Sequence, residues 1–256
     1  MGLEDVYRVT PKLRAADASA VDALQSWLGA PLPQGYRAYA TTLGTGTYNG
    51  FLTVRMPHDI QAECAARQAF VREHFDDFWG GDGGMQRDEA SRAVSFAHSV
   101  DGDEVFYSRE RQRLFVLPRH AACVHWMPQG FDDPLDWRLP AASAVEAAGG
   151  QFRYFNSHRD QQIVELFNGK ALQVDEVAVY IGSRLSVAHR IDAVWGVRLF
   201  LPEIHGMLQL SQAPNDDRVR IRLEHDIGCD ALAAPLLDGL LGRGFRETWR
   251  HRPRAL

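Results

Sequence analysis

Residues 28–36 read Leu-Gly-Ala-Pro-Leu-Pro-Gln-Gly-Tyr, and this stretch decides how the first half of the chain begins to fold. Before it, residues 19–28 carry apolar side chains at helical spacing, and Gly29 is a typical helix end. The prolines prevent that helix from continuing. After them, residues 36–43 show helical spacing again, and a glycine pair at 44–46 ends the segment. The stretch therefore predicts two helices joined by a proline-rich turn.

The first helix has a predicted start and a predicted buried face. Ser19 followed by Asp22 resembles a capping box at its beginning. The apolar residues that should face the core are Val21, Leu24, Trp27 and Leu28.

Residues 51–56 predict a strand that ends at Pro57, and Asp59 is suited to cap a longer helix after it. The core-facing residues of this longer helix should be Ile60, Cys64, Val71, Phe75 and Phe78.

A run of short strands follows the glycine-rich loop at residues 80–84. Residues 94–98, 105–107 and 114–117 are rich in β-branched and aromatic side chains, and Asp101-Gly102-Asp103 is a hairpin signal. Residues 123–127 predict one more strand. Because hairpin-length links join these strands, we expect helices packed against a mainly antiparallel sheet, an α+β fold.

The second half predicts a smaller α+β unit. The small residues of 139–150 favour a connector, so we expect domains at 1–140 and 151–256. Ser157 is suited to cap a helix with Ile163, Leu166 and Phe167 on one face. Further predictions for this half are a strand with Val177, Val179 and Ile181 alternating, strands at 195–201, 207–210 and 219–223, and a last helix over 232–241 that starts near Pro235.

The composition of the chain indicates the cellular compartment and the general class of the protein. The net charge is −5; residues 1–150 hold 14 basic and 20 acidic residues, and residues 151–256 hold 14 and 13. Only Lys12 and Lys170 are lysines, so arginine dominates the basic residues and suggests a bacterial source. The first residues lack a secretory pattern, and no stretch approaches the ~18 apolar residues of a membrane span. Three scattered cysteines favour a reducing compartment, so we expect a cytoplasmic protein without a membrane segment.

The first half resembles the SUKH superfamily over about half of the chain. The likeness begins at residues 28–37, with the pattern Leu-Gly-x-x-Leu-Pro-x-x-Tyr, and continues through 44–46, 50–54 and 57–60. It resumes at 96–97 and at Gly102-Asp103-Glu104-Val105-Phe106-Tyr107, and it ends near 131–137. Two departures are Gln25 and Ser26, where acidic residues often precede the motif, and the long glycine-rich loop. The second half resembles no family that we can name.

The resemblance implies a protein that works by binding. Bacterial members are widely immunity proteins that neutralise a cognate toxin, often a nuclease, and fungal members look like regulators of cell-wall synthesis. The expected partner is a toxin or another protein, and no cofactor, catalytic residue or direct nucleic-acid contact is expected. The alternatives are a non-enzymatic regulatory or scaffold module that binds a housekeeping protein, and an enzyme with its site around His189, His205 or His225 in the second half.

Two acidic and aromatic clusters are the candidate partner-binding sites. The first contains Asp76, Asp77, Phe78, Trp79 and Asp82; its aromatic residues are of the kind that anchor interfaces, and its carboxylates would steer a basic partner. The other interpretation is a helix end with Phe75 and Phe78 in the core. The second cluster contains Asp132, Asp133, Asp136 and Trp137, and its pattern is equally typical of a helix start.

Other motifs give weaker signals. His120, Cys123 and His125 lie close in sequence but lack a second ligand pair, so no metal site is expected. No nucleophile elbow, phosphate-binding loop or zinc-protease motif is present in the sequence. Nucleic-acid binding is a further possibility suggested by arginines 218, 220 and 222 and by those at 243, 246, 250, 252 and 254. No aromatic stacking platform accompanies these arginines in the sequence. A solvated strand face and a basic tail explain them.

Overall fold

The computed structural model describes residues 2–79, 85–120, 122–127, 130–131, 152–168, 172–193, 196–212 and 218–251. The chain forms two compact units. The first comprises Met1–Tyr7, Leu13–Ala142 and Arg153–Ser157, and the second comprises Arg8–Lys12, Ser143–Phe152 and His158–Leu256. Both combine helices with mostly antiparallel sheets, which confirms the predicted α+β class.

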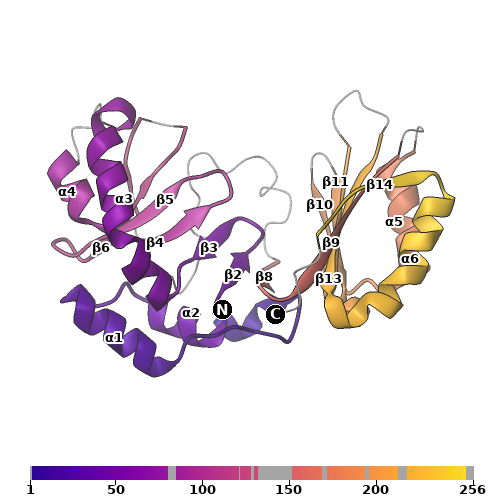
Figure 1. Cartoon of the computed structure of the whole chain (residues 1–256), viewed down its shortest axis with the longest axis horizontal. Helices are drawn as coiled ribbons and strands as arrows, with labels where there is room; N and C mark the ends of the chain where they lie inside the picture. The colour runs from indigo at the N-terminus through magenta and orange to yellow at the C-terminus, as the bar shows by residue number, and fades with distance from the viewer. Residues whose placement is uncertain are drawn as a thin grey trace. The chain divides into compact units, whose positions relative to one another are not determined.

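Four α-helices belong to the first unit (Figure 1): α1 (Ala18–Leu28), α2 (Tyr36–Thr42), α3 (Pro57–Phe78) and α4 (Arg87–Arg92). A short 3-10 turn, η1 (Leu3–Asp5), precedes them. Gly29 ends α1 in the left-handed conformation, with φ 63°, as the sequence predicts. The Leu-Gly-Ala-Pro-Leu-Pro stretch therefore does separate two helices.

The first sheet contains eight strands in the order β1-β8-β2-β3-β4-β5-β6-β7. Their bounds are β1 (Tyr7–Arg8), β2 (Gly46–Tyr48), β3 (Leu52–Val54), β4 (Val94–Ser99), β5 (Glu104–Ser108), β6 (Arg113–Leu117), β7 (His125–Trp126) and β8 (Tyr154–Ser157). The hairpin between β4 and β5 turns at Gly102, whose φ is 90°. Strand β8 comes from beyond residue 150, so the first unit draws on both predicted halves.

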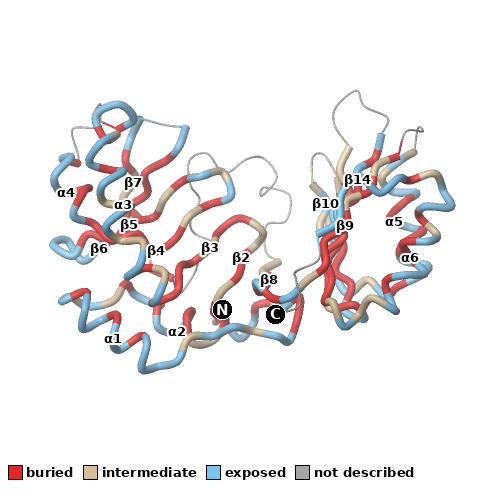
Figure 2. Tube along the Cα trace, viewed as in Figure 1, coloured by how far each residue is buried: buried red, intermediate tan, exposed pale blue. Residues whose placement is uncertain are grey.

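Side chains alternate along β5 and β6 between two cores. Val105 and Tyr107 join the core that contains α1 and α2, whereas Phe106 packs under α3 and α4. Helix α3 contributes Ile60 to the first core and Phe75 to the second. This arrangement fixes which side of α3 remains in water, as the mixed colours along the helix show (Figure 2).

The second unit is a six-stranded sheet with two helices on one face (Figure 1). The strand order is β10-β11-β12-β13-β9-β14. Its elements are β9 (Gln161–Asn168), α5 (Val174–Gly182), β10 (His189–Ala193), β11 (Gly196–Leu201), η3 (Pro202–Ile204), β12 (Gly206–Ser211), β13 (Arg220–Asp226), η4 (Ile227–Cys229), α6 (Asp230–Gly242) and β14 (Phe245–His251). Because β9 pairs antiparallel with both β13 and β14, these two strands run parallel and α6 crosses between them.

Two predictions for the second unit are wrong. Residues 161–168 form strand β9 instead of a helix, and Ser157 belongs to β8. Residues 177–181 lie in helix α5 instead of a strand. The helix buries Val177, Tyr180 and Ile181, whereas Val179 is 72% exposed. Tertiary packing therefore overrides the alternating valines that favoured a strand.

Smaller differences concern helix ends. Helix α1 starts at Ala18 with Asp17 before it, so Ser19 lies inside the first turn and does not cap it. Helix α3 starts at Pro57, two residues before the expected cap at Asp59. Pro235 lies inside α6, which already begins at Asp230. Trp27, expected in the core, is 43% exposed.

Candidate functional site

An exposed row of aromatic side chains runs along the C-terminal half of α3. Phe70, His74 and Phe78 are four residues apart, and neighbouring ring centroids are 4.8 and 6.0 Å apart. Phe70 and Phe78 are 47% and 50% exposed. Glu73 and Asp77 lie beside these rings. We call these five residues the α3 stripe.

The helical period explains why the stripe faces water. Val71 and Phe75 point into the core below α4 and are nearly fully buried. Residues 70, 74 and 78 follow each other at intervals of four and lie away from that side. The expectation that Phe78 faces the core is therefore wrong for its side chain.

The carboxylates of the stripe lack an arginine or lysine partner among the described residues. Their basic neighbour is His74, whose Nε2 lies 4.0 Å from Glu73 and whose Nδ1 lies 3.9 Å from Asp77. Asp76, one position away, is bound instead by Arg87 at 2.9 Å. Glu73 and Asp77 therefore present negative charge next to two exposed rings.

Trp79 has a different position from its neighbours. It is 6% exposed, packs against Phe75, and donates its Nε1–H to the Pro118 carbonyl oxygen at 2.8 Å. A side chain buried and hydrogen-bonded in this way cannot meet a partner. We therefore remove Trp79 from the candidate surface and assign it to the core.

Several other candidate residues lie outside the described residues. These are Asp82 of the first cluster and the whole second cluster, Asp132, Asp133, Asp136 and Trp137. The sequence analysis also missed three members of the α3 stripe, Phe70, Glu73 and His74. The sequence feature that could have revealed them is the four-residue spacing of the aromatic rings. The apolar residues between these positions made that spacing hard to recognise.

A buried ionic network lies between α3 and the first sheet. Arg55 is buried, and its guanidinium donates to Glu63 at 3.3 Å, Ser95 at 2.9 Å and Glu104 at 3.2 Å. Arg67 of α3 binds the same two glutamates. Partial burial would raise the pKa of Glu63, but the hydrogen bonds from Arg67 and Arg55 outweigh it and lower the pKa.

A second buried network surrounds Asp226 at the end of β13. The side chain is fully buried, and its Oδ1 accepts from Arg159. Its Oδ2 lies 3.2 Å from the Thr10 hydroxyl, 3.2 Å from the Lys12 ammonium and 3.4 Å from His205 Nδ1. Burial would raise the pKa of Asp226, but these bonds, from Arg159 above all, lower it. Both oxygens are therefore engaged in contacts that stabilise the unit.

The histidines of the second unit occupy separate surroundings. His205 belongs to the Asp226 network, and His189 stacks on Phe152 with ring centroids 4.2 Å apart. His225 is buried, and its Nδ1 lies 3.0 Å from the Asp226 carbonyl oxygen. Burial lowers the pKa of His225, and the carbonyl bond opposes this only in part.

The helix-free face of β13, β9 and β14 carries arginines around an aromatic ring. Arg220 and Arg246 are the cross-strand neighbours of Phe167. The guanidinium of Arg220 lies 5.7 Å from the Phe167 ring centroid, and that of Arg218 lies 5.1 Å away. Sequence reasoning missed this ring because residues 161–168 were expected to be helical.

One arginine of this face is ion-paired within the unit. Arg222 donates to Glu165 at 3.0 Å and to Glu224 at 2.7 Å. The side chains of Trp249 and His251 stack on each other at the sheet edge. We define the arginine face as Phe167, Arg218, Arg220, Arg222 and Arg246.

No family model, curated protein or solved structure matches the chain.

The described residues form neither a metal-binding group nor a membrane-spanning helix. Within the described part of the chain, no three side chains of His, Cys, Asp or Glu come close enough to hold a metal ion, and Cys123 and His125 form no such group with His120. None of the described helices is both long and apolar enough to cross a bilayer.

Proposed function

We propose that the chain is an immunity protein that neutralises a cognate bacterial toxin by direct binding, and that the α3 stripe is its docking surface. The observation that carries the proposal is the pair of half-exposed rings, Phe70 and Phe78, flanked by the exposed carboxylates of Glu73 and Asp77, which contact no arginine or lysine among the described residues. The SUKH-like motifs of the first half supply the functional class.

The side chains of the stripe fit a basic protein partner. Large exposed rings gain most when a partner removes them from water, and aromatic residues commonly dominate binding energy at interfaces. Carboxylates beside the rings attract a basic surface, such as the substrate-binding face of a nuclease, and speed up association. Covering that face would block the toxin without any chemistry by the immunity protein.

The helix beneath the stripe is rigidly supported. Trp79 anchors its end to Pro118, and Arg87 of α4 holds Asp76. A partner therefore meets rings on a preorganised helix, which reduces the entropy lost on binding.

The direct test is co-expression with the product of the adjacent reading frame. We expect that product to be toxic alone and to co-purify with this chain when both are present. Phe70→Ala and Phe78→Ala should each weaken binding about 30-fold, which corresponds to about 2 kcal/mol per anchor. Trp27→Ala is the matched control, because Trp27 is a similarly exposed ring on α1.

The result can also count against the proposal. If the neighbouring product is harmless and does not bind, the immunity function is excluded. If the stripe variants instead lose a housekeeping protein recovered from the host, the chain is a regulatory module that uses the same surface.

A further inference from the structure

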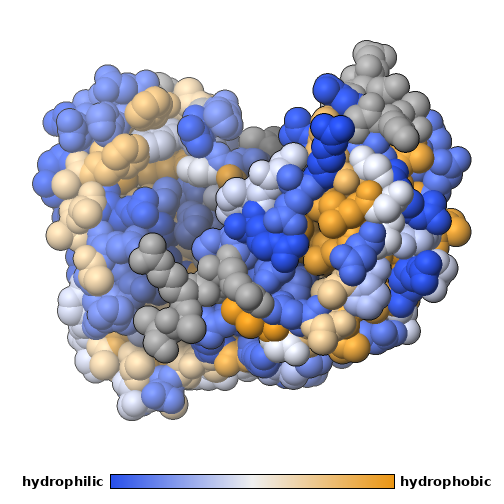
Figure 3. Space-filling model, turned by 45° about the vertical axis from the view of Figure 1, so that its right-hand side comes forward, coloured by the Kyte–Doolittle hydropathy of each residue, from blue (hydrophilic) through white to orange (hydrophobic). Residues whose placement is uncertain are grey.

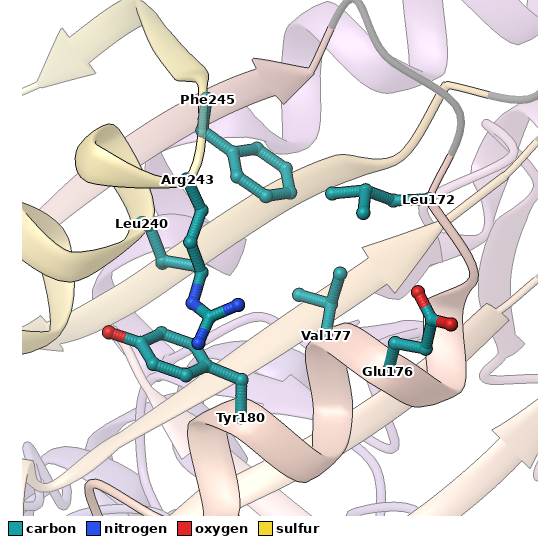
Figure 4. Close-up of a pocket in the computed structure, with 7 residues that line it drawn as sticks. All are labelled: Leu172, Glu176, Val177, Tyr180, Leu240, Arg243 and Phe245. Atoms are coloured by element: carbon teal, nitrogen blue, oxygen red, sulfur yellow. The ribbon is translucent and has the colours of Figure 1, made fainter.

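A pocket opens between the two helices of the second unit. Its volume is about 270 Å³, and Figure 4 shows its lining residues: Leu172, Glu176, Val177, Tyr180, Leu240, Arg243 and Phe245. This volume is just below the range typical of small-ligand sites. A compact molecule would therefore fill it.

The sequence builds the pocket from the packing of α5 against α6. The hydroxyl of Tyr180 lies so close to Gly239 that a Cβ there would be 1.8 Å away. Glycine at 239 therefore lets the Tyr180 side chain reach α6, and Leu240 and Phe245 form an apolar floor beside it. Figure 3 shows apolar residues at the surface of the second unit among hydrophilic ones.

Two opposite charges line this apolar space. The Arg243 guanidinium lies over the Tyr180 ring, 3.9 Å from its centroid, and makes no ion pair with a described residue. Glu176, in the first turn of α5, likewise has no hydrogen-bond or ion-pair partner among them. Figure 4 shows Arg243 and Glu176 on either side of Val177. Each charge is thus available to a ligand.

We infer that this pocket binds a free apolar α-amino acid. The carboxylate of the ligand pairs with Arg243, its ammonium group pairs with Glu176, and its side chain packs against Leu172, Val177 and Phe245. Both charged side chains are exposed to solvent, so a ligand with a single charge would gain only one of the two charge-assisted contacts. Charge-assisted hydrogen bonds to the carboxylate and to the ammonium group, together with apolar contact, select a zwitterion with a hydrocarbon side chain.

The amino-acid site is independent of the α3 stripe and of any toxin. Titration calorimetry with the full chain can test it, using L-leucine and L-phenylalanine as probes. N-acetyl-L-leucine lacks the ammonium charge and L-leucinamide lacks the carboxylate. We expect each derivative to bind at least tenfold more weakly than L-leucine, because each loses one charge-assisted contact.

Two variants assign the contacts. Arg243→Gln should weaken L-leucine about tenfold and remove most of its advantage over L-leucinamide. Glu176→Gln should do the same for the advantage over N-acetyl-L-leucine. Arg184→Gln is the matched control, because Arg184 also lies over the Tyr180 ring, 5.4 Å from its centroid, but does not line the pocket. Unchanged thermal unfolding of all three variants separates binding from folding.

The inference is overturned by either of two results. One is the absence of heat with millimolar L-leucine and L-phenylalanine. The other is equal binding of L-leucine and its two blocked derivatives, which would mean that the charges play no part.

Discussion

The α3 stripe and the arginine face combine aromatic rings and charges in opposite ways. On α3, Phe70 and Phe78 stand next to carboxylates that no arginine or lysine of the described residues neutralises. On the second sheet, the Phe167 ring is already covered by Arg218 and Arg220, and Arg222 is held by two glutamates. At these residues the arginine face contacts its ring and two carboxylates within its own unit, whereas the α3 stripe presents its rings and carboxylates to solvent.

The same contrast separates two carboxylates, one in each unit. In the second unit, Asp226 is enclosed by Arg159, Lys12 and Thr10, and these contacts stabilise the fold. Asp77, which has the same carboxylate group, lies on the outer side of α3. Exposure and pairing, more than residue type, therefore separate a structural charge from a docking charge.

The largest expected effect comes from removing the enclosed charge. Asp226→Ala removes the carboxylate that the buried Arg159 binds; the other contacts described for its guanidinium, with the Gln161 side-chain oxygen and the His205 carbonyl oxygen, carry no charge. The free energy of unfolding should fall by about 3–5 kcal/mol, measured by urea denaturation. Asp77→Ala is the control and should change it by no more than about 0.5 kcal/mol. Equal effects of the two substitutions would break the comparison.

The adjacent residues Phe78 and Trp79 provide a second, smaller contrast. Trp79→Phe loses the bond to the Pro118 carbonyl and leaves space in the core, so the first unit should lose about 2–3 kcal/mol. Phe78→Ala should cost about 0.5 kcal/mol or less, because its side chain is half exposed. If Phe78→Ala destabilises as strongly as Trp79→Phe, the ring belongs to the core and the stripe is not a free surface.

Mild acid should weaken both units through one histidine in each, partly buried His98 in the first and buried His225 in the second. Burial lowers the pKa of His98 in β4, and the nearby charge of Arg55 lowers it further; burial also lowers the pKa of His225. The unfolded chain then takes up protons first, so stability is lost as the pH falls below the ordinary value of 6.5. The loss is about 1.4 kcal/mol for each unit of pKa difference.

Single substitutions can separate the two histidines. His225→Gln should remove the part of the decline between pH 6.5 and 5 that belongs to the second unit, and His98→Gln the part that belongs to the first. Urea denaturation at several pH values measures both. A stability that stays constant across this range would contradict the account.

The smallest expected effect concerns the charges of the stripe. Glu73→Gln combined with Asp77→Asn should slow association with a basic partner several-fold and reduce its dependence on salt. The dissociation rate should change little. Stopped-flow measurements at two salt concentrations would show this, with Glu110→Gln as a control outside the stripe. An increase in the association rate would mean that the partner is acidic.

The first unit was largely predictable because glycine and proline mark its boundaries. Gly29 and Gly102 adopt the positive φ angles that their helix end and hairpin require, so the α1 end and the β4–β5 turn follow from the sequence. What failed was the choice of face. Trp27 and Phe78 share helical spacing with core residues, yet both are exposed.

The second unit was harder because its hydrophobic periods mislead. Strand β9 buries Gln162, Ile163 and Val164 in succession, so the alternation typical of a half-buried strand begins only at Val164. In α5 the valines alternate, although Asp175 and Glu176 in the first turn favour a helix start. The pairing of Asp226 with Thr10 spans 216 positions and had no local signal. The same holds for the pocket between α5 and α6.

Hydrogen–deuterium exchange of the chain, alone and with the toxin that we propose as its partner, tests the docking claim most directly. New amide protection should concentrate in the C-terminal half of α3, around Phe70, His74 and Phe78, with the arginine face unchanged. Protection confined to β13, β9 and β14, with α3 exchanging as in the free chain, would contradict it.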